Sequence, residues 1–199
     1  MTVSDHSIHA GWWLATLLAA GLLACAGGYH VERDIDDLGT ETVIMDKNEI
    51  GIEGEREYSD YAISGTDMYL TGVEQYCALD AARRTKMDGS RHYYLRFTYT
   101  GPRELNIADR RSLQLVFDDQ SSVTLSGRGE VERESDPMSG SWSETFYYAI
   151  DDEVLVRLSE ADEVHVVVTG SEFELRCYLL ERNFDAFQAF VRDYVHWKN

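Results

Sequence analysis

The alternation of apolar and polar side chains is clearest from residue 91 onward. In residues 91–101 every second side chain is apolar and falls on one face, namely Tyr93, Leu95, Phe97 and Tyr99. This period of two is typical of a half-buried β-strand. Residues 113–117 repeat the pattern, and a polar turn then leads into residues 122–126. The chain therefore predicts a β-hairpin after the first long strand.

The last third of the chain predicts the order β-α-β-β-α. Strand patterns cover residues 145–150, 163–169 and 173–179, and a short helix begins after Asp151. The chain closes with a helix from Asn183 whose apolar side chains recur at helical spacing. Those side chains are Phe184, Phe187, Phe190, Val191, Tyr194 and Val195.

The first half of the chain has weaker signals. Residues 41–45 and 67–71 are short apolar runs that we interpret as strands, and residues 77–84 as a brief helical or turn segment. Residues 127–141 are polar and predict a long loop. Because the strands adjoin in hairpins, the pattern predicts an α+β fold, mainly antiparallel sheet or sandwich, with two helices in the C-terminal third.

An apolar run at residues 11–25 precedes this domain. It has the length of a secretory signal core and is too short to span a bilayer comfortably. Its last four residues, Leu22-Leu23-Ala24-Cys25, resemble the lipobox of bacterial lipoprotein precursors. The resemblance implies cleavage before Cys25, lipidation of its thiol, and attachment to a membrane by the acyl chains. The alternative is an uncleaved hydrophobic N-terminal anchor, or a cysteine that merely packs.

The resemblance also implies a location and a domain organisation. With Ala26 after the cysteine, the family pattern places a Gram-negative lipoprotein in the outer membrane facing the periplasm, or the domain on the surface of a single-membrane cell. We therefore expect a signal peptide at residues 1–24, a flexible tether at residues 25–40 and one acidic globular domain at residues 41–199.

The net charge of the chain restricts the classes of partner that it can bind. There are 36 acidic and 18 basic residues, for a formal net charge of −18, and lysine occurs only at Lys47, Lys86 and Lys198. Such a chain repels phosphates, which argues against nucleic acids and anionic headgroups as ligands. The composition fits a salt-adapted source or an ordinary acidic secreted protein from a GC-rich genome. The predicted partners are the membrane, through the anchor, and a protein of the envelope.

Two cysteines remain once Cys25 is assigned to lipid. These are Cys77 and Cys177. Because an even number of thiols in an oxidising compartment can pair, they are the candidate residues for a disulfide. The alternative is two unrelated thiols, with Cys177 packed as a small apolar side chain.

The sequence contains no spacing that assigns catalysis. The six histidines lack metal-binding spacing, no nucleophile elbow is present, and neighbouring acids such as Asp118-Asp119 and Asp151-Asp152 are explained by turns and helix caps. We therefore assign no catalytic residue, metal or cofactor. The tyrosines of the strands are either core residues or an exposed aromatic surface; they are Tyr93, Tyr94, Tyr99, Tyr147 and Tyr148.

The sequence thus predicts a lipid-anchored envelope protein with a non-catalytic binding or structural domain of unknown specificity. One alternative is a cell-envelope hydrolase that uses carboxylates. Another is a small inhibitor or immunity-type protein that captures a basic partner.

Overall fold

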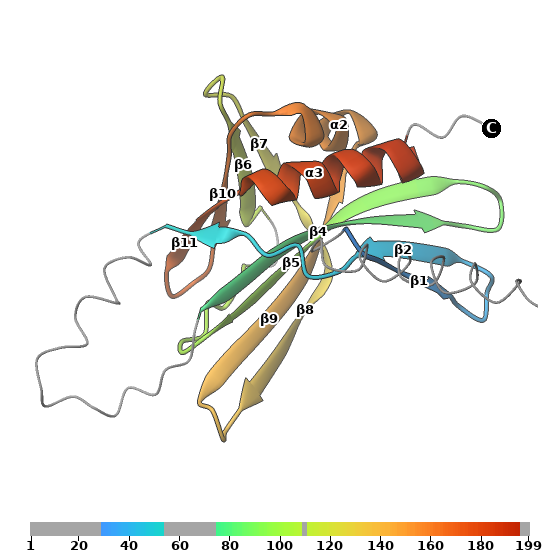
Figure 1. Cartoon of the computed structure of the whole chain (residues 1–199). Helices are drawn as coiled ribbons and strands as arrows, with labels where there is room; N and C mark the ends of the chain where they lie inside the picture. Colours follow the sequence, from blue (N-terminus) through green and yellow to red (C-terminus); the bar gives the residue numbers. More distant parts are fainter. Residues whose placement is uncertain (1–28, 54–74, 109–110, 196–199) are drawn as a thin grey trace, which may run out of the picture.

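Two antiparallel β-sheets and two helices make up the computed structural model, which describes residues 29–53, 75–108 and 111–195 (Figure 1). The six-stranded sheet has the spatial order β1 (Val31–Ile35), β2 (Glu41–Met45), β4 (Tyr76–Thr85), β5 (Arg91–Gly101), β9 (Ser141–Ile150) and β8 (Gly127–Asp136). The five-stranded sheet has the order β3 (Gly51–Ile52), β11 (Glu174–Tyr178), β10 (Val164–Thr169), β6 (Leu113–Phe117) and β7 (Ser122–Leu125). The predicted α+β fold is confirmed.

The core lies on the inner faces of the two sheets. On β5, Leu95, Phe97 and Tyr99 of the predicted face are buried and Tyr93 is half-buried against the core, whereas Arg96 and Thr98 point to the other face. The cross-strand register places Phe97 opposite Phe146 of β9, and both side chains are fully buried. The alternation of apolar and polar side chains along β5 therefore reflects a sheet with one face in the core.

The helices complete the core against the inner face of the six-stranded sheet. Helix α2 (Asp152–Glu160) and helix α3 (Glu181–Phe190) lie side by side, and α3 continues as a π-helical turn, η1 (Val191–Val195) (Figure 1). Their buried side chains Leu155, Leu158, Phe187 and Phe190 belong to the same core. The Tyr93 hydroxyl donates to the Tyr194 carbonyl at 3.4 Å, which fixes η1 against the inner face of β5.

The helical or turn segment predicted near residues 77–84 is wrong, because these residues lie within the ten-residue strand β4. The strand is buried on both faces: Leu79 faces the core, and Ala78 and Asp80 are covered on the outer face. A strand that is buried on both faces has no alternation of apolar and polar side chains. The alanines of β4 favour a helix by intrinsic propensity, and tertiary packing overrides that preference.

The long loop predicted at residues 127–141 is also wrong over most of its length. Residues 127–136 form β8, an edge strand paired with β9, and only the turn before Ser141 is irregular. Seven of the ten residues of β8 are polar or charged, and the strand contains a bulge between Arg128 and Glu132. Charges and bulges are how natural edge strands avoid pairing with other chains, and they hide the strand pattern.

The tether predicted at residues 25–40 is wrong from residue 31 onward. Val31–Ile35 form β1, which pairs with β2 across the turn at residues 36–40. In that turn the Asp36 carboxylate accepts the backbone N–H groups of Leu38 at 3.0 Å and Thr40 at 2.8 Å. The domain therefore begins about ten residues earlier than its predicted start. The signal peptide, Cys25 and the strand predicted at residues 67–71 lie outside the described residues.

Candidate functional site

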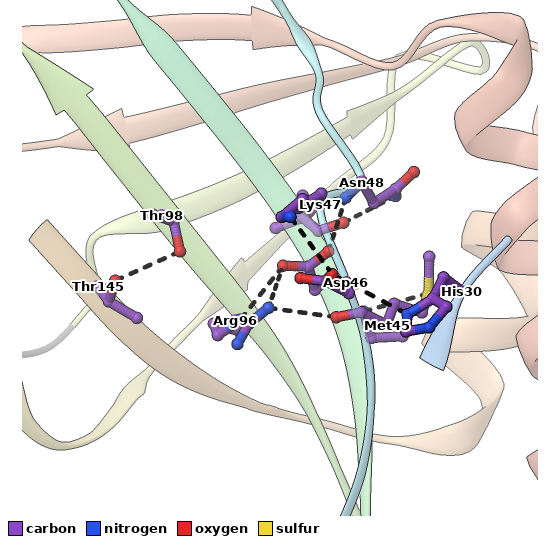
Figure 2. A network of polar contacts seen from close by, with 11 residues as sticks. His30, Met45, Asp46, Lys47, Asn48, Arg96, Thr98 and Thr145 are labelled. Atoms are coloured by element: carbon purple, nitrogen blue, oxygen red, sulfur yellow. Dashed lines mark hydrogen bonds and ion pairs between the residues drawn. The ribbon is translucent and has the colours of Figure 1, made fainter. Parts of the chain in front are cut away.

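A charged pair lies on the outer face of the six-stranded sheet. The β4–β5 register places Asp80, which is 1% exposed, directly opposite Arg96. Arg96 Nη2 and Nε donate to Asp80 Oδ2 at 2.8 and 3.2 Å, and Asp80 Oδ1 accepts the backbone N–H of Asn48 at 2.9 Å (Figure 2). Burial raises the pKa of Asp80, while the Asn48 N–H and the Arg96 guanidinium act in the opposite direction. Arg96 Nη2 also donates to the Met45 carbonyl at 3.2 Å, so both charged side chains hold the backbone.

The backbone held by this pair is an irregular segment at residues 46–49, after β2. Lys47 adopts a left-handed conformation with φ of 56°, which is uncommon for a residue with a Cβ atom. The next residue, Asn48, donates its side-chain amide to the Leu79 carbonyl at 2.8 Å, and its own carbonyl accepts the Leu79 N–H at 3.0 Å. Asp80 and Asn48 therefore stabilise a conformation that Lys47 would not adopt by itself.

Helix α3 is attached to the same segment. Asn183 is fully buried, and its amide nitrogen donates to Asn48 Oδ1 at 2.7 Å and to the Glu49 carbonyl at 2.8 Å. Its amide oxygen accepts the Leu180 N–H at 2.6 Å, at the first turn of the helix. One connected set of polar contacts consequently links β5, β4, residues 46–49 and α3.

A small hollow of about 90 Å³ opens beside this network at the beginning of the described domain. His30 Nδ1 and Lys47 Nζ lie 4.0 and 3.9 Å from Asp46 Oδ2 (Figure 2). Its lining residues include Tyr29, His30, Asp46, Lys47, Glu49 and Arg182. Pockets for drug-sized ligands have volumes of about 300–1,000 Å³, so this hollow does not indicate a small-molecule site.

A larger hollow of about 400 Å³ lies on the outer face of the five-stranded sheet. His165 of β10 is held there between two carboxylates, with Nδ1 2.6 Å from Glu53 Oε1 and Nε2 3.0 Å from Glu163 Oε1. Two carboxylates that accept from one ring favour the protonated imidazole, and the hydrogen bond with Glu53 is the main cause that raises the pKa of His165. Asp118 is a third carboxylate in the lining of this hollow, and Arg176 is a cation in the same lining.

A further buried carboxylate, Glu144 of β9, organises the connection between the two sheets. It is completely buried, and its two oxygens accept the N–H groups of Asn106 at 2.6 Å and Ile107 at 2.8 Å. Arg133 Nε lies 3.5 Å from the same carboxylate. This carboxylate therefore holds the residues that cross from β5 to β6.

The predicted disulfide residues are contributed by opposite sheets. Cys77 lies on β4 and Cys177 on β11, and both are fully buried in the single core. The bridge between them stays a prediction.

Of the acidic pairs singled out in the sequence, Asp118-Asp119 has the expected turn contacts, whereas Asp151 lacks the expected side-chain cap. Asp119 accepts the Ser121 N–H at 2.9 Å within the β6–β7 turn and pairs with Arg157 at 2.8 Å. Asp151 is the N-cap residue of α2, although its side chain makes no capping hydrogen bond.

The tyrosines divide between the two faces of the six-stranded sheet. Tyr99 and Tyr148 are fully buried on the inner face, and Tyr93 packs against the core. Tyr94 and Tyr147 are half-buried on the outer face, where Tyr147 is the cross-strand neighbour of Arg96. The aromatic surface considered from the sequence is therefore reduced to these last two rings.

The residues that organise these sites were not identified from the sequence. Asp80 interrupts an otherwise apolar run, and a lone acid in such a run signals a buried charge that needs a partner. Arg96 occupies a polar position of an alternating strand, as any exposed residue would. Asn48 and Glu144 have no local signal, because their partners are distant in sequence, and the contact of Asn183 with Asn48 is equally distant.

Within the described ranges, no helix is long and apolar enough to span a membrane, and no group of three or more His, Cys, Asp or Glu side chains is arranged to hold a metal ion. Comparison with protein-family models, curated proteins and solved structures found no significant match to this chain.

Proposed function

We propose that the chain is a lipid-anchored protein of the bacterial cell envelope whose domain binds a partner or has a structural role, without catalysis. The observation that carries this proposal is the lipobox-like sequence ending in Cys25, at the close of an apolar run of signal-peptide length. Tyr29 and Val31, which follow Cys25 closely in sequence, pack against the core, and this agrees with the proposal. Two or three acyl chains would hold such a domain stably at a membrane.

The use made of the buried carboxylates supports the non-catalytic part of the proposal. Asp80 accepts a backbone N–H and pairs with Arg96, and Glu144 accepts two backbone N–H groups. Each of these groups therefore has a structural task. Buried charges with complete sets of partners are typical of structural networks.

Incorporation of a labelled fatty acid tests the proposal. The full chain, expressed in a bacterial host that is fed labelled palmitate, should carry label and sediment with the membranes. Cys25→Ser should carry none, whereas Cys177→Ser, the matched control, should be labelled like the wild type. Equal label in the wild type and in Cys25→Ser would reject lipidation at Cys25.

A second candidate is the capture of a basic partner. The net charge of −18 attracts cations at long range, and Glu53, Asp118 and Glu163 exceed in number the cations His165 and Arg176 in the hollow on the five-stranded sheet. Replacing Glu53 and Glu163 together by Gln should weaken binding of an arginine-rich peptide in calorimetry. The same charge change at the exposed residues Glu130 and Glu134 should leave that affinity nearly unchanged.

The hydrolase alternative concerns the same two carboxylates. If the full chain cleaved a cell-wall glycan and Glu53→Gln abolished the cleavage, the hydrolase would replace the binding module as the proposed function.

A further inference from the structure

We infer that the domain sits directly on the membrane and faces the bilayer with the surface around Tyr29, Lys47 and Arg182. This inference rests on the proposed lipidation of Cys25. Four Cα–Cα steps of about 3.8 Å separate Cys25 from Tyr29, so even an extended chain spans only about 15 Å. The tether predicted to residue 40 would have allowed about 50 Å. The occupant of this surface is therefore the headgroup layer of the bilayer that holds the acyl chains.

The first described residues are fixed to the domain. Tyr29 and Val31 pack against the core, and Tyr29 lies beside Tyr194 of η1. Burial is the main cause that raises the pKa of Tyr29, as expected for a phenol covered by protein. The His30 carbonyl accepts the Asp46 N–H at 3.1 Å, just before the β1–β2 pairing begins. The short link therefore positions the folded domain, and no loose segment intervenes after Tyr29.

The charge around Tyr29 is compatible with a headgroup layer. Three cations and three carboxylates lie in this region: Lys47, Arg182, Arg192, Asp46, Glu49 and Asp193. Arg182 pairs with Glu49 at 3.4 Å, and Arg192 pairs with Asp193 at 2.8 Å. These positive and negative charges are equal in number, whereas the whole molecule has a net charge of −18. Anionic lipids would repel most of its surface. The anchor thus emerges where the electrostatic cost of approaching a bilayer is low.

Two of the three lysines report on this orientation. Lys47 lines the hollow next to Tyr29 and its side chain is 82% exposed. Lys86 is exposed in the β4–β5 turn, at the far end of the β1–β2 pairing. The strand between these points covers four residue steps, or about 14 Å. Figure 1 shows the hairpin of β1 and β2 projecting away from the middle of the six-stranded sheet. Lys47 should therefore be screened by the bilayer and Lys86 should stay accessible.

Amine labelling on vesicles tests the inference. The acylated protein is purified from membranes and reconstituted into vesicles of phosphatidylethanolamine and phosphatidylglycerol. A succinimidyl ester on a polymer too bulky to enter a gap of about 15 Å is added, and peptide mass spectrometry quantifies each lysine. The matched control carries a 20-residue Gly-Ser insertion after Ala26. We expect modification of Lys47 relative to Lys86 to be at least about fivefold lower in the wild type than in the insertion variant.

The outcomes separate the two proposals. Acylated protein with equal labelling of Lys47 and Lys86 on vesicles would overturn the orientation and leave the proposed function intact. Protection of Lys47 that persists in the insertion variant would also overturn it, because the short link would not be its cause. Purified protein without acyl mass would reject the proposed function, and the orientation with it.

Discussion

At the scale of single residues, buried charged side chains hold backbone groups of this molecule in place. Glu144 shows this most clearly, because one carboxylate satisfies two backbone N–H groups of the connection between the sheets. A buried donor left without a partner costs about 1–3 kcal/mol. The stability of the sheet connection therefore depends on an acid that an alternating strand pattern does not reveal.

Replacing Glu144 by Ala should lower the free energy of unfolding by about 2–5 kcal/mol, because Asn106 and Ile107 would lose their acceptor inside the protein. Urea denaturation measures this change. Glu134→Ala, at an exposed position of the neighbouring strand β8, should stay within about 0.5 kcal/mol of the wild type. Equal losses in the two variants would show that Glu144 is not a structural acceptor.

His165 should titrate above its ordinary pKa of 6.5, because Glu53 and Glu163 both accept from the ring. Its protonated form is stabilised in the folded state, so this contribution is complete below pH 6.5 and is lost as pH rises through the raised pKa. The imidazole is 41% exposed, so the effect on stability should be small. An NMR titration of the ring protons should give a midpoint above 6.5 that falls in Glu53→Gln. An unchanged midpoint in that variant would contradict the Glu53 contact.

At the scale of elements, one buried side chain, Asn183, links helix α3 to residues 46–49. Asn183 bonds Asn48 and the Glu49 carbonyl, and it also accepts the N–H that begins the helix. The helix and the irregular segment should therefore be coupled energetically.

A double-mutant cycle on Asn48→Ala and Asn183→Ala measures this coupling. We expect an interaction free energy of about 1–3 kcal/mol in chemical denaturation, because the two amides share one hydrogen-bonded network. The control cycle pairs Asn183→Ala with Gln114→Ala on β6, and it should be additive within about 0.5 kcal/mol. Additivity of the Asn48 cycle would contradict the proposed link.

The elements differ in how well their sequences predict them. Strand β5 is predictable because one face is buried and the other is not, so its side chains alternate. Strand β4 is buried on both faces and β8 is an exposed edge, so neither alternates and both were misassigned. The polar network could not be predicted, because Asn48 and Asn183 are 135 residues apart and only the tertiary fold brings them together.

At the scale of the whole molecule, the dominant feature is a net charge of −18 on 199 residues. Self-repulsion between carboxylates destabilises a compact acidic domain, and salt screens it because the Debye length falls from about 10 Å at 0.1 M to about 3 Å at 1 M. Stability of this fold should therefore depend on ionic strength.

The free energy of unfolding should rise by about 1 kcal/mol or more between 0.05 and 1 M NaCl, as measured by urea denaturation. A variant with Gln in place of the exposed β8 residues Glu130, Glu132 and Glu134 should show a smaller rise, because it has less repulsion to screen. A free energy that is flat or decreasing with salt would contradict the role of self-repulsion.

The central claim is that Cys25 anchors this domain to a membrane by lipid. Intact mass spectrometry of the protein purified from bacterial membranes, before and after reduction, tests it most directly. The account predicts a chain that begins at Cys25 and carries the mass of two or three acyl groups. A gain of about 2 Da on reduction would add the predicted Cys77–Cys177 bridge. A full-length chain without acyl mass would contradict the account.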